Sequence, residues 1–273
     1  MSPRPFTALE RPPVIPDVHP DRWWPTAAWH RKVDGRTVDA GRTADLDRFD
    51  DRVRSDGGVP LQETGPRNTT VLQSKPWWQL SKLPLPERVW LSDNGDSQWF
   101  GVDQAAGRYF EVSSLGPIWF GSWWRADSVR RYDLTKPWED QGRSLTGAGV
   151  PLWPMIPTPQ DLAKGSCTTA LHLVMAGYSF DRPVGIARKT DGLDADHPVR
   201  AGEHLRLTST ALARLTGAPM TMPQSAVVWA LRRYGCIATD QTSPTAGHNL
   251  RLPAGVNVDL PLRLTDLEVL VPT

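Results

Sequence analysis

Proline is the residue that most limits what this chain can fold into. It occupies 26 of 273 positions, and seven of these prolines fall within the first 25 residues. Because proline fixes φ, lacks a backbone N–H and pushes the preceding residue out of the helical region, long helices are disfavoured. Proline and glycine together make 48 residues, below the share of roughly 25–30 % that marks a low-complexity chain. The sequence therefore predicts a folded protein without dominant helices.

The first 60 residues have the composition of an extended arm. After the prolines, mixed charges follow, with ten Lys/Arg and ten Asp/Glu in the whole segment. Trp23, Trp24 and Trp29 are out of place in a purely solvated segment, because each can bury a large apolar area. We expect residues 1–60 to be an anchoring arm whose three tryptophans bind a partner or the main domain, with a disordered tail as the alternative.

Residues 61–273 favour a β body. Asn94-Gly95, between aromatic and β-branched runs, predicts a hairpin over 88–102, continued by a strand to residue 113. More strands are expected at 117–124, 168–175, 178–188, 204–207 and 262–271. One amphipathic helix at about 223–235 has basic residues in its last turn and Gly235 at its C-terminal cap. We predict a mainly β, mostly antiparallel domain over 61–273 with one packed helix.

Charge, hydropathy and cysteine content exclude several classes of partner. Lys and Arg number 31 against 30 Asp and Glu, so no basic field favours nucleic acid. No apolar run approaches the roughly 20 residues of a membrane span, and the first 30 residues lack the apolar stretch of a secretory signal. Cys167 and Cys236 are too few for a disulfide framework, and either a disulfide or two buried thiols stays open.

The sequence carries no catalytic signature. We find no H-E-x-x-H, C-x-x-C or G-x-S-x-G motif and no phosphate-binding glycine loop. The acidic segment around His197 and His204 is expected to be a solvated loop, with an ion site as the alternative. We therefore expect no catalytic residue, no metal and no cofactor. For an enzyme that acts on polysaccharide, Glu111, Asp181 and Asp240 would be the acid/base candidates, although carboxylates on the wet face of a sheet are ordinary.

Tryptophan is the second unusual residue, with 13 copies. Exposed indole rings can stack on sugars, whereas most tryptophans in a β domain pack in the core or anchor protein interfaces. Trp123 and Trp124 are adjacent, so they should point to opposite faces of a strand. The candidate glycan-binding residues are Trp123, Trp124, Tyr178 and Asp181.

Five short segments carry a resemblance to a group of β-rich proteins. They are Gly149–Ile156, Asp161–Gly165, Ala170–Leu171, Ala201–Leu207 and Ala230–Asp240. Over about 88–245 the chain resembles secreted bacterial proteins of poorly defined activity and minor tail proteins of actinobacterial phages. The resemblance implies a jelly-roll-like sandwich. Secreted members tend to carry His before Ala-Leu, where this chain has Thr169, and a secretory signal, which this chain lacks; both departures favour the phage branch.

We therefore expect a structural protein of a phage virion, namely a minor tail protein assembled in the host cytoplasm. It would dock on other virion proteins, form homo-oligomers within the particle and contact host cell-surface polysaccharide. The alternatives are a polysaccharide-active enzyme, either a glycoside hydrolase or a lyase, and a lectin-like carbohydrate-binding module on a jelly-roll scaffold. An enzyme is the less favoured of these classes, because no catalytic motif supports it.

Overall fold

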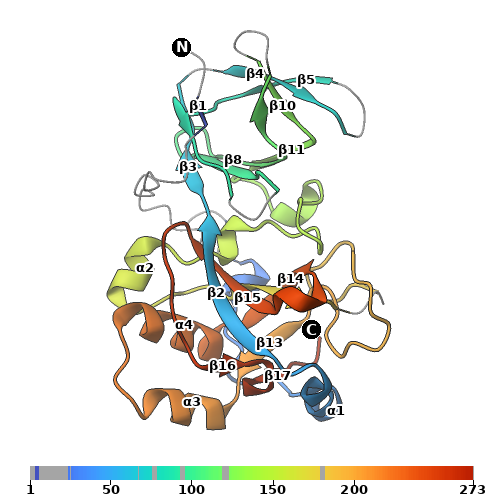
Figure 1. The fold of residues 1–273 in the computed structure, drawn as a ribbon, viewed down its shortest axis with the longest axis vertical. Coiled ribbons are helices and arrows are strands. Elements are labelled where there is room, and N and C mark those ends of the chain that lie inside the picture. The colour runs from blue at the N-terminus through green and yellow to red at the C-terminus, as the bar shows by residue number, and fades with distance from the viewer. Residues whose placement is uncertain are drawn as a thin grey trace. The chain divides into compact units, whose positions relative to one another are not determined.

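The computed structural model describes residues 4–5, 24, 26–66, 68–75, 79–92, 96–118, 123–178 and 182–272. The predicted mainly β class is confirmed: several sheets are accompanied by a few helices (Figure 1). The chain divides into two compact units. Unit 1 comprises residues 1–18, 58–145 and 253–255, and unit 2 comprises 19–57, 146–252 and 256–273. The crossing after residue 57 lies near the predicted boundary at residue 60, and the chain passes between the units at four further places, after residues 18, 145, 252 and 255.

Unit 1 is built from short strands in three sheets, two of four strands and one of two. Their orders are β5-β4-β10-β9, β11-β8-β7-β3 and β1-β6. The strands are β1 (Arg4–Pro5), β3 (Leu61–Glu63), β4 (Thr69–Gln73), β5 (Gln79–Leu83), β6 (Arg88–Val89), β7 (Trp99–Asp103), β8 (Arg108–Ser113), β9 (Gly116–Pro117), β10 (Trp124–Ala126) and β11 (Ser128–Asp133).

The predicted meander is shifted by one strand. β7 and β8 pair antiparallel as expected, through a turn in which Gly107 takes a positive φ of 60°. The third strand of the meander is β11, which pairs with β8, whereas β6 pairs with β1. The predicted Asn-Gly turn lies outside the described residues. The sheets also contain parallel pairs, such as β3 with β7, which alternation of side chains cannot reveal.

One apolar core joins the two four-stranded sheets of unit 1. Trp99 of β7 is fully buried in it, and its indole Nε1 donates a 3.0 Å hydrogen bond to Gln62. Gly101 makes room for that ring: a Cβ there would lie 2.2 Å from an atom of the Trp99 indole. Strand alternation and turn residues therefore produce a sandwich-like core. Its members are Val71, Leu83, Leu85, Val89, Trp99, Phe110, Val112, Leu115, Trp124, Ala126 and Val129.

Unit 2 contains a seven-stranded mixed sheet of order β16-β2-β15-β12-β14-β13-β17. Its central pair, β12 with β14, is parallel, and β12 pairs antiparallel with β15. The predicted strand at 168–175 corresponds to β12, whereas residues 182–188 form turn and irregular backbone. The strands are β2 (Arg52–Val59), β12 (Leu171–Ala176), β13 (His204–Leu207), β14 (Cys236–Thr242), β15 (His248–Pro253), β16 (Leu262–Arg263) and β17 (Leu267–Val269).

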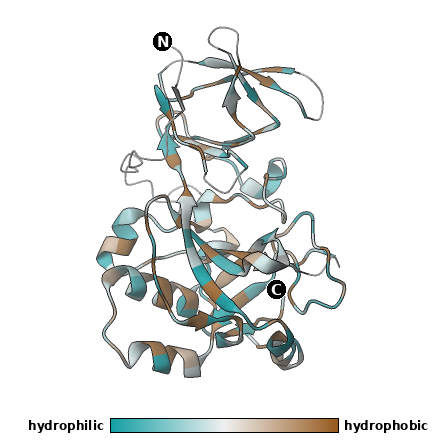
Figure 2. Cartoon of the chain, viewed as in Figure 1, coloured by the Kyte–Doolittle hydropathy of each residue, from teal (hydrophilic) through white to brown (hydrophobic). Residues whose placement is uncertain are grey.

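Four α-helices are described, all in unit 2: α1 (Ala40–Asp45), α2 (Pro159–Lys164), α3 (Ser209–Thr216) and α4 (Met222–Arg233). The predicted helix is confirmed as α4, which begins with a capping box of Thr221 and Gln224. It ends before Gly235, whose φ is 75°. α4 packs against α2, β12 and β13, and its hydropathy alternates in bands as expected of an amphipathic helix (Figure 2). Short 3₁₀ helices span Ala28–His30, Leu46–Phe49, Trp138–Asp140, Trp153–Met155, Pro244–Ala246 and Leu264–Asp266.

Trp24 and residues 26–57 of the predicted arm belong to unit 2. Trp24 and Trp29 are 4 % and 0 % exposed, and their rings meet edge to face at 6.0 Å. The backbone carbonyl of Trp29 accepts a hydrogen bond from the amide of Ala170. Within the described residues, no helix has the length and apolar character needed to cross a bilayer. Cys167 and Cys236 are both buried and form no disulfide with each other.

Candidate functional site

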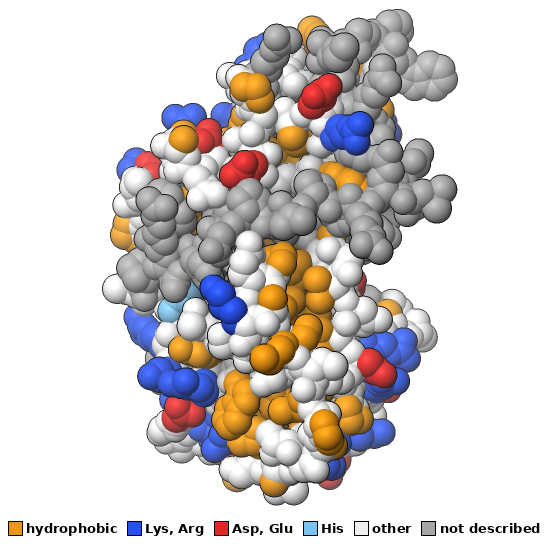
Figure 3. Space-filling view, turned by 90° about the vertical axis from the view of Figure 1, so that its left-hand side faces the viewer, with side chains coloured by type: hydrophobic (Ala, Val, Ile, Leu, Met, Phe, Trp, Pro, Cys, Tyr) orange, Lys and Arg blue, Asp and Glu red, His pale blue; other side chains and the backbone are white. Residues whose placement is uncertain are grey.

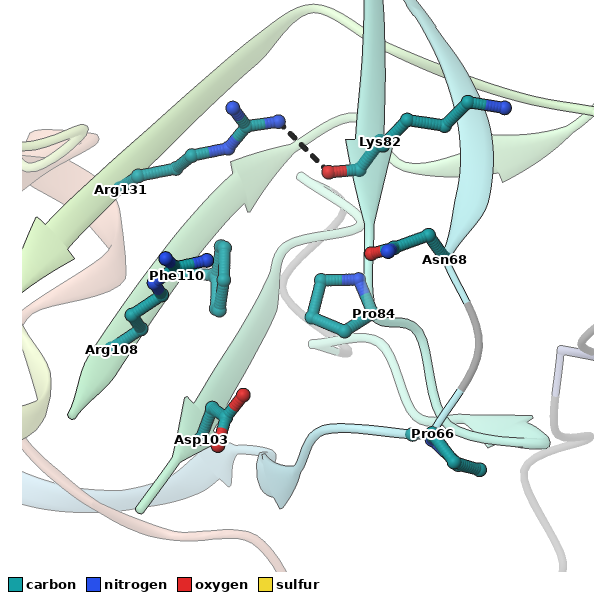
Figure 4. A pocket seen from close by; sticks show the side chains of 9 residues that line it. Pro66, Asn68, Lys82, Pro84, Asp103, Arg108, Phe110 and Arg131 are labelled. Atoms are coloured by element: carbon teal, nitrogen blue, oxygen red, sulfur yellow. Dashed lines mark hydrogen bonds between the residues drawn. The ribbon is translucent and has the colours of Figure 1, made fainter. Parts of the chain in front are cut away.

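Unit 1 has a pocket of about 420 Å³ whose walls come from both four-stranded sheets (Figure 4). This volume lies within the range of about 300–1,000 Å³ that is usual for small-molecule sites. The pocket is lined by Gly65, Pro66, Asn68, Lys82, Pro84, Asp103, Arg108, Phe110 and Arg131.

Strand register brings Arg108, Phe110 and Arg131 to one face of a sheet. Phe110 of β8 lies opposite Arg131 of β11. Arg108 precedes Phe110 by two positions, so both side chains point to the same side of β8. Because Phe110 belongs to the unit 1 core, this is the inner face of the sheet. Two guanidinium groups therefore stand where the apolar core opens to solvent.

The two arginines supply the positive charge of the pocket. Arg131 Nη2 donates a 2.9 Å hydrogen bond to the backbone carbonyl of Lys82. The Lys82 ammonium extends away from the pocket in Figure 4 and donates to Thr70 Oγ1 at 2.5 Å. Neither arginine forms an ion pair, and Arg108 forms no side-chain hydrogen bond, within the part of the chain that the structure describes. Both guanidinium groups thus keep donors for a ligand.

The remaining walls combine one carboxylate with apolar surface. Asp103 lies opposite Arg108 in the β7–β8 register, and its Oδ1 accepts the amide N–H of Ala106 at 2.9 Å. Asp103 is the one acidic side chain among the lining residues. Phe110 and Pro84 face each other across the pocket in Figure 4. A site with apolar walls and a few fixed polar groups can hold a sugar ring and orient its substituents.

Unit 2 contains a second polar arrangement, in which Tyr178, Asp191 and Asp240 meet around Gly147. The Tyr178 hydroxyl donates a short hydrogen bond to Asp191, and Asp240 Oδ1 accepts the Gly147 amide at 3.2 Å. A Cβ on Gly147 would lie 2.2 Å from Asp191 Oδ1 and 2.5 Å from the Tyr178 hydroxyl oxygen. A larger residue at position 147 would have to displace the Asp191 and Tyr178 side chains, so segments far apart in sequence are tightly assembled at this point.

This arrangement raises the pKa of Asp240 and of Tyr178. Burial, together with the neighbouring Asp191 carboxylate, raises the pKa of Asp240 to about 6. Burial and the hydrogen bond to Asp191 also raise the pKa of Tyr178, which keeps its hydroxyl protonated. Arg251, which is ion-paired with Asp56, opposes the shift of Asp240. The three side chains form a proton-holding cluster of the kind found at acid/base sites as well as in structural networks.

The residues that the sequence predicts to bind a partner or a glycan differ in how exposed they are in the structure. Trp123 is 45 % exposed, whereas Trp124 is 1 % exposed and belongs to the unit 1 core. The opposite-face prediction for this pair agrees with these exposures. Trp124 cannot stack on a glycan as predicted, because its ring is enclosed; the enclosed Trp24 and Trp29 likewise present no ring to a partner. Tyr178 is fully buried, and Trp23 and Asp181 lie outside the described residues.

Glu111, an acid/base candidate, has a structural position in unit 1. It is fully buried and accepts hydrogen bonds from the hydroxyls of Tyr109 and Ser144 and from the amide of Leu145. Asp240 is the acid/base candidate with a perturbed pKa. Across the described residues, no group of three His, Cys, Asp or Glu side chains could hold a metal ion.

Sequence reasoning missed the pocket residues. The sequence indicates that these side chains lie together only when the pairing of β8 with β11 is known. Alternation along the paired strands then places Arg108, Phe110 and Arg131 on one face of the sheet.

The acidic segment around His197 and His204 is not the solvated loop that the sequence predicts, because His197, Glu203 and His204 are all buried. Asp191 of the same segment is exposed, and it accepts a hydrogen bond from the buried Tyr178.

Apolar side chains gather over the helical part of unit 2 (Figure 3). The exposed large apolar residues of α4 are Met222 and Trp229, which are 59 % and 43 % exposed. They are seven residues apart and so lie on one side of the helix.

Comparisons with known protein families, with curated proteins and with solved structures gave no match. Functional inference therefore rests on the two arrangements described above and on the segments that carry the resemblance.

Proposed function

We propose that this chain is a structural protein of a phage tail and that unit 1 contacts host cell-surface glycan. The observation that carries the glycan part is the unit 1 pocket, which has the volume, the apolar walls and the polar groups that suit a sugar. The resemblance over about 88–245 supports the tail part. The tryptophans Trp24 and Trp29 are left out of the proposed docking surface, because they are buried within unit 2.

Blocking the pocket tests the glycan part. Asn68 is exposed at the pocket, so Asn68→Trp should fill it without disturbing the core. Gln79→Trp, at an exposed position of β5 that does not line the pocket, is the matched control. The full chain and the Gln79→Trp variant should sediment with host cell walls, and Asn68→Trp should not. Equal sedimentation of all three, or of none, would contradict pocket-mediated binding.

Co-purification tests the tail part. An epitope-tagged full chain, produced during infection, should migrate with intact particles in a density gradient and remain after a high-salt wash. Immunogold labelling should place it on tails. A chain that stays at the top of the gradient while particles form normally would overturn the assignment to the virion.

The proton-holding cluster favours a second function, cleavage of polysaccharide. A carboxyl group with a pKa of about 6 beside a carboxylate is suited to acid/base work. Wall polysaccharide incubated with the full chain at pH 5–7 would then yield new reducing ends or unsaturated products, and Asp240→Asn would abolish them. Retained binding without turnover by the unaltered chain would reject this function and leave a lectin-like module.

A further inference from the structure

We propose that the unit 1 pocket selects glycans that carry an anionic substituent, a carboxylate or a phosphate, through the guanidinium groups of Arg108 and Arg131. This inference rests on the proposed glycan contact and names its ligand class. Two guanidinium groups line the pocket against one carboxylate, and the ammonium of Lys82 points elsewhere.

Arg108 and Arg131 differ from a structural arginine in their ion pairing. An arginine that serves the fold commonly binds a carboxylate of its own chain, as Arg251 does with Asp56 in unit 2. Arg108 and Arg131 have no such partner in the described residues. Asp103, the nearest candidate by strand register, has one oxygen engaged by the Ala106 amide and forms no ion pair with Arg108 within those residues. The pocket therefore keeps unneutralised positive charge.

The guanidinium group is well suited to bind a carboxylate or a phosphate. Its planar fork matches the two oxygens of a carboxylate or phosphate, and it is more weakly hydrated than an ammonium group, so it loses less when a ligand displaces water. Arg131 is held in place by its hydrogen bond to the Lys82 carbonyl, which uses only Nη2. Arg108 has all its donors available in the described part of the chain. Together they offer one fixed and one adaptable cation.

The apolar wall of the pocket favours a sugar over a free anion. A free inorganic anion would need only the two arginines, whereas Phe110 and Pro84 add a surface against which C–H groups can pack. The exposed amide of Asn68 can reach ligand hydroxyls from the rim. An acidic sugar within a chain uses all three kinds of group, whereas a neutral sugar supplies no negative charge to balance the two arginines.

The test compares four ligands by calorimetric titration of the full chain: polygalacturonate, poly(glycerol phosphate), dextran as the neutral glycan and sodium phosphate as the free anion. We expect at least one polyanion to bind more tightly than dextran and free phosphate, with affinity falling as NaCl rises. Preference between the two polyanions identifies whether the anion is a carboxylate or a phosphate.

Variants assign the preference to the pocket. Arg108→Ala breaks no hydrogen bond of the described fold, and we expect it to weaken polyanion binding about ten- to hundredfold. Arg131→Lys, which keeps the charge and loses the fork, should weaken it by a smaller factor. Arg125→Ala removes an exposed charge of β10 outside the pocket and should change little.

Three results would overturn the inference. Equal affinity for dextran and the polyanions would reject anion selection while leaving the glycan contact standing. Equal losses in Arg108→Ala and Arg125→Ala would show attraction by overall charge. Binding of none of the glycans, with each chain confirmed as folded by its thermal transition, would reject the glycan contact together with this inference.

Discussion

The Asp240→Asn substitution should stabilise the protein above neutral pH and have little effect in acid. Burial and the nearby Asp191 carboxylate raise the pKa of Asp240 to about 6 from its ordinary value of 3.8. The folded state therefore holds a proton that the unfolded chain has already lost between these two pH values. The stability that comes from this neutral carboxyl is fully present below about pH 4 and is lost as the pH rises through about 6.

The size of the effect follows from the two pKa values. A difference between about 6 and 3.8 corresponds to about 3 kcal/mol, at about 1.4 kcal/mol per pH unit. Asparagine keeps an oxygen that can accept the amides of Gly147 and Gln241, which both donate to Asp240 Oδ1. The asparagine side chain carries no charge, so the variant should not lose folding stability at this position as the pH rises through about 6.

Urea unfolding of the full chain at several values between pH 4 and 8 measures this difference. The variant and the unaltered chain should agree near pH 4 and differ by about 3 kcal/mol at pH 8, with the variant more stable. Asp34→Asn, at an exposed position of unit 2, is the control and should give a difference that does not change with pH. A flat difference for Asp240→Asn, or a variant that is less stable at pH 8, would refute the reasoning.

Three other predictions concern packing and burial. Gly101→Ala should lower the free energy of unfolding by about 1–3 kcal/mol, because the added Cβ meets the Trp99 ring. Gly116→Ala is the control and should be tolerated, because the space around Gly116 is open. Equal urea midpoints for the two variants would contradict this prediction. Glu111→Ala should lower the free energy of unfolding by about 3 kcal/mol or more in urea titration, since two buried hydroxyl donors and the part-buried amide of Leu145 lose this acceptor. A change under about 1 kcal/mol would show that the network is not needed. Burial raises the pKa of the Cys236 thiol, so this thiol should react with a thiol reagent at pH 8 only after denaturation. Rapid labelling of Cys236 in the native chain would disprove its enclosure.

Local sequence signals predicted individual elements well. The helix α4 follows from its apolar spacing, the basic residues of its last turn and the glycine behind it, all of which act within about one turn. The strands β7 and β8 follow from alternating aromatic and β-branched residues on either side of a turn. The predicted strand at 178–188 failed over its described residues, where local β propensity gave way to irregular backbone.

The two candidate sites could not be predicted because each depends on contacts between distant segments. Arg108 and Arg131 are joined by the β8–β11 register, and register is set by which face of a whole sheet is buried. Asp191 comes close enough to raise the pKa of Asp240 only when their segments converge on Gly147. Trp24 and Trp29 gave a true signal of burial, yet the sequence could not say whether a partner or the chain itself would cover them.

By itself, then, the sequence determined the mainly β class, the principal helix and the need to bury its N-terminal tryptophans, because φ restriction, side-chain alternation and capping are properties of neighbouring residues. Tertiary structure alone decided that the chain forms two units, that two arginines open onto one pocket and that Asp240 holds a proton near pH 6. Those properties arise from burial and charge proximity, which depend on residues brought together from across the whole chain.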